Sequence, residues 1–120
     1  MEMIRTKRVY SPPERSDGAR FLVDRLWPRG VSKDAARIDE WRKELAPSGE
    51  LRKWFEHDPS KWEEFQRRYR SELESAGRME DLRSLGMKAR KETITLVYAA
   101  RDETHNNAVA LEKLIETLSD

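Results

Sequence analysis

The stretch Thr93-Ile-Thr-Leu-Val-Tyr-Ala99 decides the fold of this chain, because it is the strongest strand pattern in the sequence. Its residues are β-branched, aliphatic or aromatic, and apolar side chains fall on both faces of the expected strand. A strand of this kind is typical of the buried centre of a parallel sheet, whereas a strand with one wet face alternates between apolar and polar residues. We therefore predict a central parallel strand over residues 93–99.

Weaker strand patterns precede it, and helical patterns lie between and after the strands. Residues 3–9 and 20–24 are predicted strands, and residues 38–41 are predicted as a short strand or an extended segment. Caps and apolar periodicity predict helices over residues 32–37, 48–56, 60–77, 79–90 and 105–118. This order predicts an α/β fold: a single small domain over residues 1–120, with a mainly parallel sheet flanked by helices.

The later helices carry the predicted core. Ser60 and Glu63 have the spacing of a capping box at the start of the helix over residues 60–77. Large apolar residues then recur every three or four positions, as one buried helix face requires: Trp62, Phe65, Tyr69 and Leu73. The last helix is predicted to direct five residues toward the core: Val109, Leu111, Leu114, Ile115 and Leu118.

The composition excludes several classes of site. The 120 residues include no cysteine, which excludes disulfides, thiolate nucleophiles and cysteine-bound metal centres. The sequence has no zinc-spaced histidine pair, glycine-rich phosphate loop or dinucleotide fingerprint, so we expect neither a metal nor a redox cofactor. No apolar run approaches the ~20 residues of a membrane span. We expect a soluble, cytoplasmic protein with no membrane partner.

The charges are unevenly distributed along the chain. The net charge is only +1, which is not the electrostatic footprint of a protein that coats nucleic acid. Residues 1–37, however, hold nine Lys and Arg against five Asp and Glu. The sequence therefore favours one local anionic ligand over an extended nucleic-acid surface.

The basic segment contains the first candidate loop, Asp24-Arg-Leu-Trp-Pro-Arg-Gly-Val-Ser-Lys33, directly after a predicted strand. Arg25 and Arg29 could each hold a phosphate or carboxylate through two hydrogen bonds, with Trp27 over the ligand and Asp24 orienting a guanidinium. The alternative is a structural corner in which Trp27 is core and the arginines pair with Asp24 and Asp34.

The second candidate loop, Ala100-Arg-Asp-Glu-Thr-His-Asn-Asn-Ala108, follows the central strand and opens the last helix. The amide groups and dipole of that helix could receive an anion, with Arg101 and Asn106 as further ligands. Asp102 and His105 are the candidates for acid–base chemistry, as proposed catalytic residues. The alternative is that the polar side chains of this loop only cap the helix.

Parallel strands end at the same edge of a sheet, so we expect the two loops to share one basic cleft. In that case the side chains of Arg25, Arg29 and Arg101 would converge on one anion. The second histidine of the chain, His57, lies between two predicted helices and is interpreted as a cap or surface residue.

Several motifs resemble one known family. They are Lys7-Arg-Val-Tyr10, Ser16-Asp-Gly18, Leu22-Val-Asp-Arg-Leu-Trp-Pro-Arg-Gly30, Asp39-Glu-Trp41, Pro47-Ser48, Leu51-Arg52 and Leu96-Val-Tyr-Ala-Ala-Arg-Asp102, followed by Asn106. Together they resemble the YeaO-like family, a branch of the bacterial domain of unknown function 488, over essentially the whole chain. The resemblance implies a small cytoplasmic α/β protein without an assigned activity, and it carries Asp24, Arg25, Trp27, Arg29 and Asn106 over as site candidates.

The chain departs from that family at one position. The family often has Asn-His-Ala where this sequence has Asn106-Asn107-Ala108, so a histidine role at position 107 is not carried over.

Three functions remain open from the sequence. The leading one is a domain that binds a small phosphate- or carboxylate-bearing ligand, nucleotide types included, with or without catalysis. The second is a nucleic-acid-binding or processing module that uses the same arginines and Trp27. The third is a protein-interaction module that uses the charged helices over residues 48–76. The sequence predicts no particular oligomeric state.

Overall fold

The computed structural model describes residues 3–118 and contains a four-stranded parallel sheet. Its strands are β1 (Ile4–Arg8), β2 (Ala19–Leu22), β3 (Glu40–Trp41) and β4 (Ile94–Tyr98), in the order β1-β4-β2-β3. Every neighbouring pair is parallel, and all the residues of β4 are buried. The predicted α/β class and the central position of this strand are confirmed.

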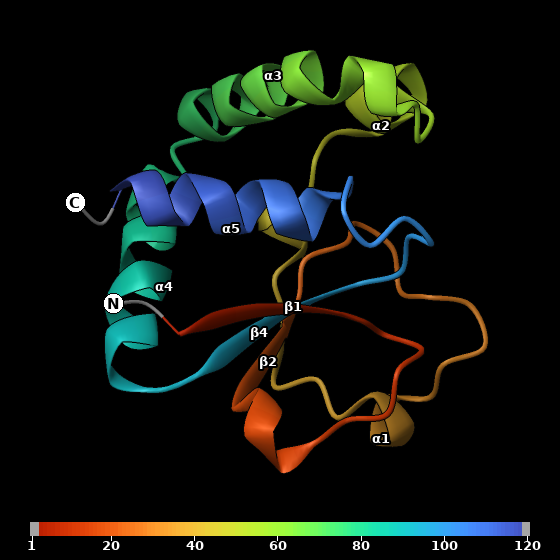
Figure 1. Ribbon diagram of the computed structural model, residues 1–120, viewed down its shortest axis with the longest axis vertical. Coiled ribbons are helices and arrows are strands. Elements are labelled where there is room, and N and C mark those ends of the chain that lie inside the picture. Colours follow the sequence, from red (N-terminus) through yellow and green to blue (C-terminus); the bar gives the residue numbers. More distant parts are fainter. Residues whose placement is uncertain (1–2, 119–120) are drawn as a thin grey trace.

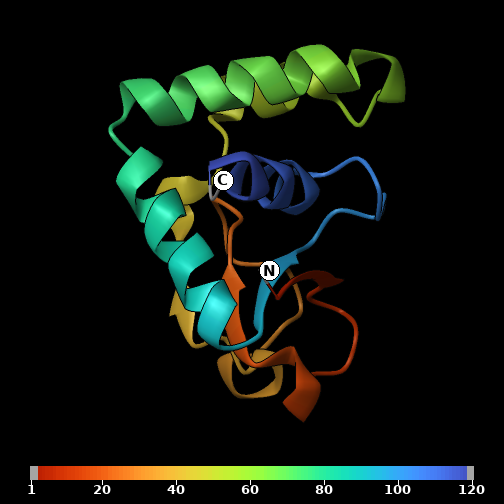
Figure 2. The ribbon, with the colours of Figure 1, turned by 60° about the vertical axis from the view of Figure 1, so that its left-hand side comes forward.

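The longer helices gather on one face of the sheet, as Figures 1 and 2 show. The helices are α1 (Lys33–Ala36), α2 (Gly49–Phe55), α3 (Trp62–Ser75), α4 (Met79–Lys91) and α5 (Asn107–Leu118). In both views α5 lies between the sheet and α3, while α1 and long connecting segments lie on the opposite side of the sheet. The carboxyl end of the sheet is therefore bordered by loops and by α2.

The main core lies between the sheet and the helices. Phe65, Tyr69 and Leu73 are buried in it as predicted, and Trp62 packs against it while partly buried. The residues of α5 that enter this core are Ala108, Ala110, Leu111 and Ile115, with Leu114 and Leu118 at its border. The prediction for Val109 was wrong, because the buried stripe of α5 runs through positions 108, 111 and 115.

The structure confirms two predicted caps and corrects a third. The side chains of Ser32 and Ser48 accept hydrogen bonds from the amides of residues 35 and 51, at the starts of α1 and α2. The capping box of Ser60 with Glu63 was wrong. Asp58 instead accepts hydrogen bonds from both the amide and the hydroxyl of Ser60, which opens a short 3-10 turn before α3.

A buried ionic cluster holds the start of β2. The fully buried carboxylate of Asp17 accepts hydrogen bonds from Arg20 Nη1 at 2.7 Å, Lys7 Nζ at 3.1 Å and the Glu14 amide at 3.0 Å. Arg20 also donates to the carbonyl oxygen of Ala36. The cluster therefore connects β1, the turn before β2, β2 itself and the end of α1.

The register of the sheet brings two loops to one edge. Leu22 pairs with Val97, and the Val23 amide continues the ladder by donating to the Val97 carbonyl. The segments after β2 and β4 therefore leave the sheet side by side, and α2 follows β3 at the same edge. A search of residues 3–118 finds no helix with both the length and the apolar character needed to cross a membrane.

Candidate functional site

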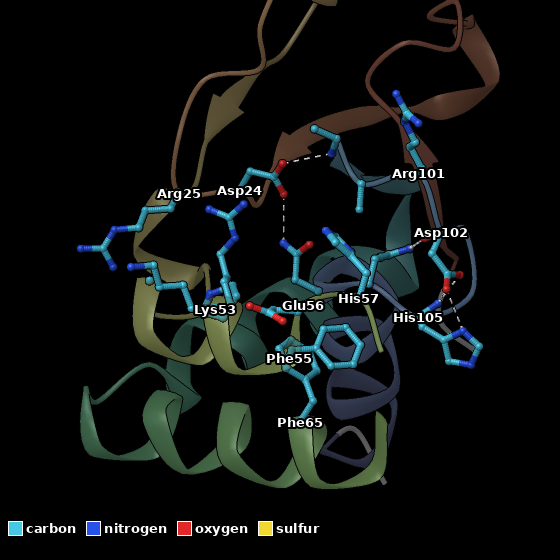
Figure 3. Close-up of a pocket in the computed structure, with 17 residues that line it drawn as sticks. Asp24, Arg25, Lys53, Phe55, Glu56, His57, Phe65, Arg101, Asp102 and His105 are labelled. Carbon is cyan, nitrogen blue, oxygen red and sulfur yellow. Dashed lines mark hydrogen bonds and ion pairs between the residues drawn. The ribbon is translucent and has the colours of Figure 1, made fainter. Parts of the chain in front are cut away.

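A cleft of about 1030 Å³ opens at the carboxyl edge of the sheet (Figure 3). Its walls come from the segment after β2, the segment after β4 and the end of α2, with Phe65 of α3 at its base. The residues that line it are Asp24, Arg25, Pro47, Gly49, Arg52, Lys53, Phe55, Glu56, His57, Phe65, Ala99, Ala100, Arg101, Asp102, His105, Asn106 and Asn107.

Asp24 joins the two strand-end loops in the wall of this cleft. One carboxylate oxygen accepts the amide hydrogen of Ala99 at 3.0 Å, and the other accepts from Asn107 Nδ2 at 3.1 Å. The same Asn107 nitrogen donates to the carbonyl of Val23 at 2.8 Å. Burial raises the pKa of Asp24 above its ordinary value, although these two hydrogen bonds oppose the shift. Both oxygens of Asp24 thus bond to residues that follow β4, and no guanidinium of the described residues lies within ion-pair distance of them. Its expected role in orienting a guanidinium stays a prediction.

Four cationic side chains line the cleft: Arg25, Arg52, Lys53 and Arg101. Figure 3 places Arg25 and Lys53 on one side of the cleft and Arg101 on the other. Within residues 3–118 none of these four makes an ion pair or a side-chain hydrogen bond. The arginines on α3 and α4 behave differently, since Arg67, Arg68, Arg70 and Arg83 each contact a carboxylate on their own helix.

The loop after β4 satisfies its own polar groups. The Asp102 carboxylate accepts the amide hydrogens of Thr104 and His105, and it lies 3.0 Å from His105 Nδ1. The amide hydrogen bond from Thr104 is the main cause that lowers the pKa of Asp102 to about 2. Asn106 is buried and caps α5 by accepting from the Val109 amide at 2.9 Å.

The capping alternative therefore describes this loop. Asp102 and Asn106 already hold the amides of Thr104, His105 and Val109. Anion binding at the remaining amides of this loop stays a prediction. The imidazole of His105 packs edge-on against Trp62, with their ring centroids 5.3 Å apart.

The amino-acid sequence of the chain as a whole matches known proteins. Residues 3–120 match the family model described as the "Inactive DUF488-N3 subclade". The chain belongs to this DUF488 family. It is 44% identical over 115 residues to the uncharacterized protein YeaO of Escherichia coli (strain K12), covering 96% of this chain and 98% of that protein. It is 39% identical over 112 residues to the uncharacterized proteins Mb3100c of Mycobacterium bovis and Rv3073c of Mycobacterium tuberculosis, covering 93% of this chain and 92% of each. No solved structure matches at a significant level.

Within this DUF488 chain, two residues predicted as ligands lie outside the lining of the cleft. Trp27 donates its indole hydrogen to the Val31 carbonyl at 2.7 Å and packs edge-on against Trp41, with ring centroids 5.6 Å apart. It belongs to the smaller apolar cluster on the loop-covered side of the sheet, as the structural alternative predicted. The backbone carbonyl of Arg29 accepts a hydrogen bond from Tyr10, and its side chain is exposed.

The end of α2 is the part of the cleft that the sequence did not predict. It supplies Arg52, Lys53, Glu56 and His57, and the last two have left-handed backbone conformations with φ of 44° and 56°. Non-glycine residues adopt this conformation at a cost, and such residues cluster at functional sites. If residues 40–41 had been predicted as a strand parallel to the others, the chain after them would have been expected at the same edge of the sheet as the two loops. The end of α2 would then have been a candidate part of the site.

The cleft of this DUF488 chain is bounded below by two stacked rings. Phe55 and Phe65 lie with centroids 4.4 Å apart, and Figure 3 shows both at the base of the cleft. Among residues 3–118 no group of three or more Asp, Glu or His side chains is arranged to hold a metal ion. At position 107, where no histidine role was carried over, the asparagine bonds to Asp24.

Proposed function

We propose that this cleft binds a small ligand carrying a phosphate or a carboxylate. The observation that carries the proposal is the set of four cations, Arg25, Arg52, Lys53 and Arg101, that line one cleft without an ion-pair partner among the described residues. The carboxylates of Asp24, Glu56 and Asp102 line the same cleft, but among residues 3–118 none of them lies within ion-pair distance of these four exposed cations. The charges and N–H donors of the cations therefore remain available to a ligand. A bound anion supplies the missing counter-charge.

The chemistry of these side chains suits an oxyanion. Guanidinium groups present paired N–H donors in a geometry that matches the oxygens of phosphate and carboxylate, and the lysine adds a point charge. Arg25 and Arg101 come from the strand-end loops, whereas Arg52 and Lys53 come from α2. The proposed site therefore keeps two of the arginines that the sequence indicated and replaces Arg29 with a pair from α2.

The proposed role is binding, without a catalytic step. The family description names the subclade inactive, and the two acid–base candidates are engaged elsewhere. Asp102 has a pKa of about 2 and is ionised at neutral pH, and His105 is bonded to it and packed on Trp62. A cytoplasmic location is likewise a proposal, and the cysteine-free sequence fits a reducing compartment.

Titration calorimetry tests this function with inorganic phosphate, citrate and ribose 5-phosphate as probes. We expect saturable binding of at least one probe at low ionic strength. Arg52→Ala and Arg101→Ala should each weaken it by roughly 10- to 100-fold, the loss typical of one charged hydrogen-bonding group. Arg83→Ala is the matched control, because Arg83 is an exposed arginine paired with Glu80 on α4.

Two results would contradict the proposal. One is the absence of binding for every probe, and the other is an equal loss of affinity in the control and the cleft variants. The salt dependence separates the proposal from the nucleic-acid alternative. A single small anion gives a shallow loss of affinity with salt, whereas a strand held through several phosphates gives a steep one.

A further inference from the structure

The cleft contains hydrogen-bond acceptors as well as cations. Asp24 lies in its wall and Glu56 at the end of α2, and neither carboxylate makes an ion pair with a described residue. Arg52 lines the same cleft and acts on Asp24 only through longer-range attraction. Asp102 is a third carboxylate in the lining. A bare inorganic anion would be attracted by the cations and repelled by these carboxylates. The combination therefore suits a ligand that carries both an anionic group and hydrogen-bond donors.

The Asp24 carboxylate has acceptor positions that the described residues do not use. A carboxylate can accept about four hydrogen bonds, two at each oxygen. Each oxygen of Asp24 accepts one, from Ala99 or from Asn107, and these bonds fix the plane of the group. Because Asp24 lines the cleft, its remaining acceptor positions are the ones that a ligand could use. Two adjacent N–H groups on a flat ring would match the two oxygens.

The size and base of the cleft indicate a ring. A volume of about 1030 Å³ greatly exceeds what a phosphate ion needs, and it lies at the upper end of the volumes usual for small-molecule pockets. The base is formed by the stacked Phe55 and Phe65, on which an apolar or aromatic body can pack. Both rings already pack in the core, with Phe55 5% and Phe65 2% exposed, so they offer a ligand a small apolar base. A phosphate alone would leave this base and the open acceptor positions of Asp24 without a ligand contact.

We propose that the ligand is a nucleoside monophosphate whose base presents adjacent N–H donors to Asp24, with its phosphate held by the cleft cations. This inference rests on the proposed anion-binding function and adds the chemical class of the ligand. Guanine has an N1–H beside its 2-amino group and so offers the edge that a carboxylate accepts best. Hypoxanthine has only the N1–H, and ribose 5-phosphate has no base.

Four probes separate the parts of the proposal: guanosine 5′-monophosphate, inosine 5′-monophosphate, ribose 5-phosphate and guanosine. We expect guanosine monophosphate to bind wild-type protein at least about tenfold more tightly than ribose 5-phosphate, with inosine monophosphate between them. Asp24→Asn should abolish the preference for guanosine monophosphate over ribose 5-phosphate. The affinity for ribose 5-phosphate should rise slightly, because the variant removes a carboxylate that repels the phosphate. The asparagine can still accept from the Ala99 amide, but its NH₂ group then faces Asn107 Nδ2, which is held by the Val23 carbonyl. A circular-dichroism melting curve therefore checks that the variant is folded before its affinities are compared.

The outcomes distinguish this inference from the function beneath it. Equal affinities for guanosine monophosphate and ribose 5-phosphate would overturn the ligand class while anion binding stands. Binding of guanosine as tight as that of its monophosphate would overturn both, because the cations would then contribute nothing. If a folded Asp24→Asn protein still prefers guanosine monophosphate, Asp24 does not accept hydrogen bonds from the base, and the proposed recognition of the base is wrong. If that variant does not fold, the wild-type comparison decides the ligand class alone.

Discussion

Replacing Asp17 with asparagine should be among the most destabilising single changes in this protein. The carboxylate is fully buried between Arg20 Nη1 at 2.7 Å and Lys7 Nζ at 3.1 Å, and Arg20 is itself 3% exposed. The change removes the negative charge and leaves a buried guanidinium whose other bonds reach only a carbonyl oxygen. Breaking a buried pair from one side costs roughly 3–5 kcal/mol, a large part of the total stability of a small domain.

Urea denaturation measures this cost, with Glu80→Gln as the control. Glu80 pairs with Arg83 on the surface of α4, where losing such a bridge costs about 0–1 kcal/mol. We expect the midpoint for Asp17→Asn to fall far below that for the control, with unchanged slopes. A loss below about 1 kcal/mol for Asp17→Asn would refute the reasoning, since it would show that the cluster is solvated or dispensable.

The same cluster makes a prediction for acid pH. Burial alone would raise the pKa of Asp17, but the hydrogen bonds from the Glu14 amide, Lys7 and Arg20 outweigh it and lower the pKa below 3.8. The stabilisation is therefore complete above the unfolded-state pKa of 3.8 and is lost as the pH falls through the lower folded-state value. The stability difference between wild type and Asp17→Asn should stay constant above this range and shrink below it.

Three further predictions concern the core and the cleft. Phe65→Ala should cost roughly 3–5 kcal/mol in urea denaturation, and Trp62→Ala should cost less because Trp62 is only partly buried; a nearly neutral Phe65→Ala would contradict the core assignment. His57→Gly should raise the unfolding free energy by about 0.5–1 kcal/mol, since glycine relieves the left-handed backbone, and a lower melting temperature would show that the histidine side chain stabilises the turn. Arg29→Ala should leave the affinity for ribose 5-phosphate unchanged while Arg101→Ala weakens it, and calorimetry showing the reverse would restore the site predicted from the sequence.

The arrangement of the sheet was predictable because its signals are local or follow from general rules. The run over residues 93–99 is apolar on both faces, and only a central strand covered on both sides accommodates such a run. Because parallel strands end at one edge of a sheet, the sequence alone predicted that Asp24 and Asp102 lie at the same edge. Both residues line the cleft. The periodicity of α3 likewise placed Phe65 and Tyr69 in the core.

The remaining features depend on tertiary contacts that spacing does not encode. Trp27 and Arg25 are two residues apart in one loop, yet the tryptophan packs against Trp41 while the arginine lines the cleft. The two-residue strand β3 is too short to give a pattern of its own, so the position of Arg52 at the cleft could not be predicted. Ser60 could pair with Glu63 or with Asp58, and the structure shows the bond to Asp58. The spacing of the residues alone does not decide between two such caps.

Anion binding by the cations of the cleft can be observed at the cations themselves. The most direct measurement is a side-chain ¹H–¹⁵N NMR titration that follows the arginine Nε–H signals as guanosine monophosphate or ribose 5-phosphate is added. The account predicts saturable shifts for Arg25, Arg52 and Arg101 with a common affinity, and little change for Arg83, which already contacts Glu80. Shifts that are absent, or that spread equally over paired and unpaired arginines without saturating, would contradict it.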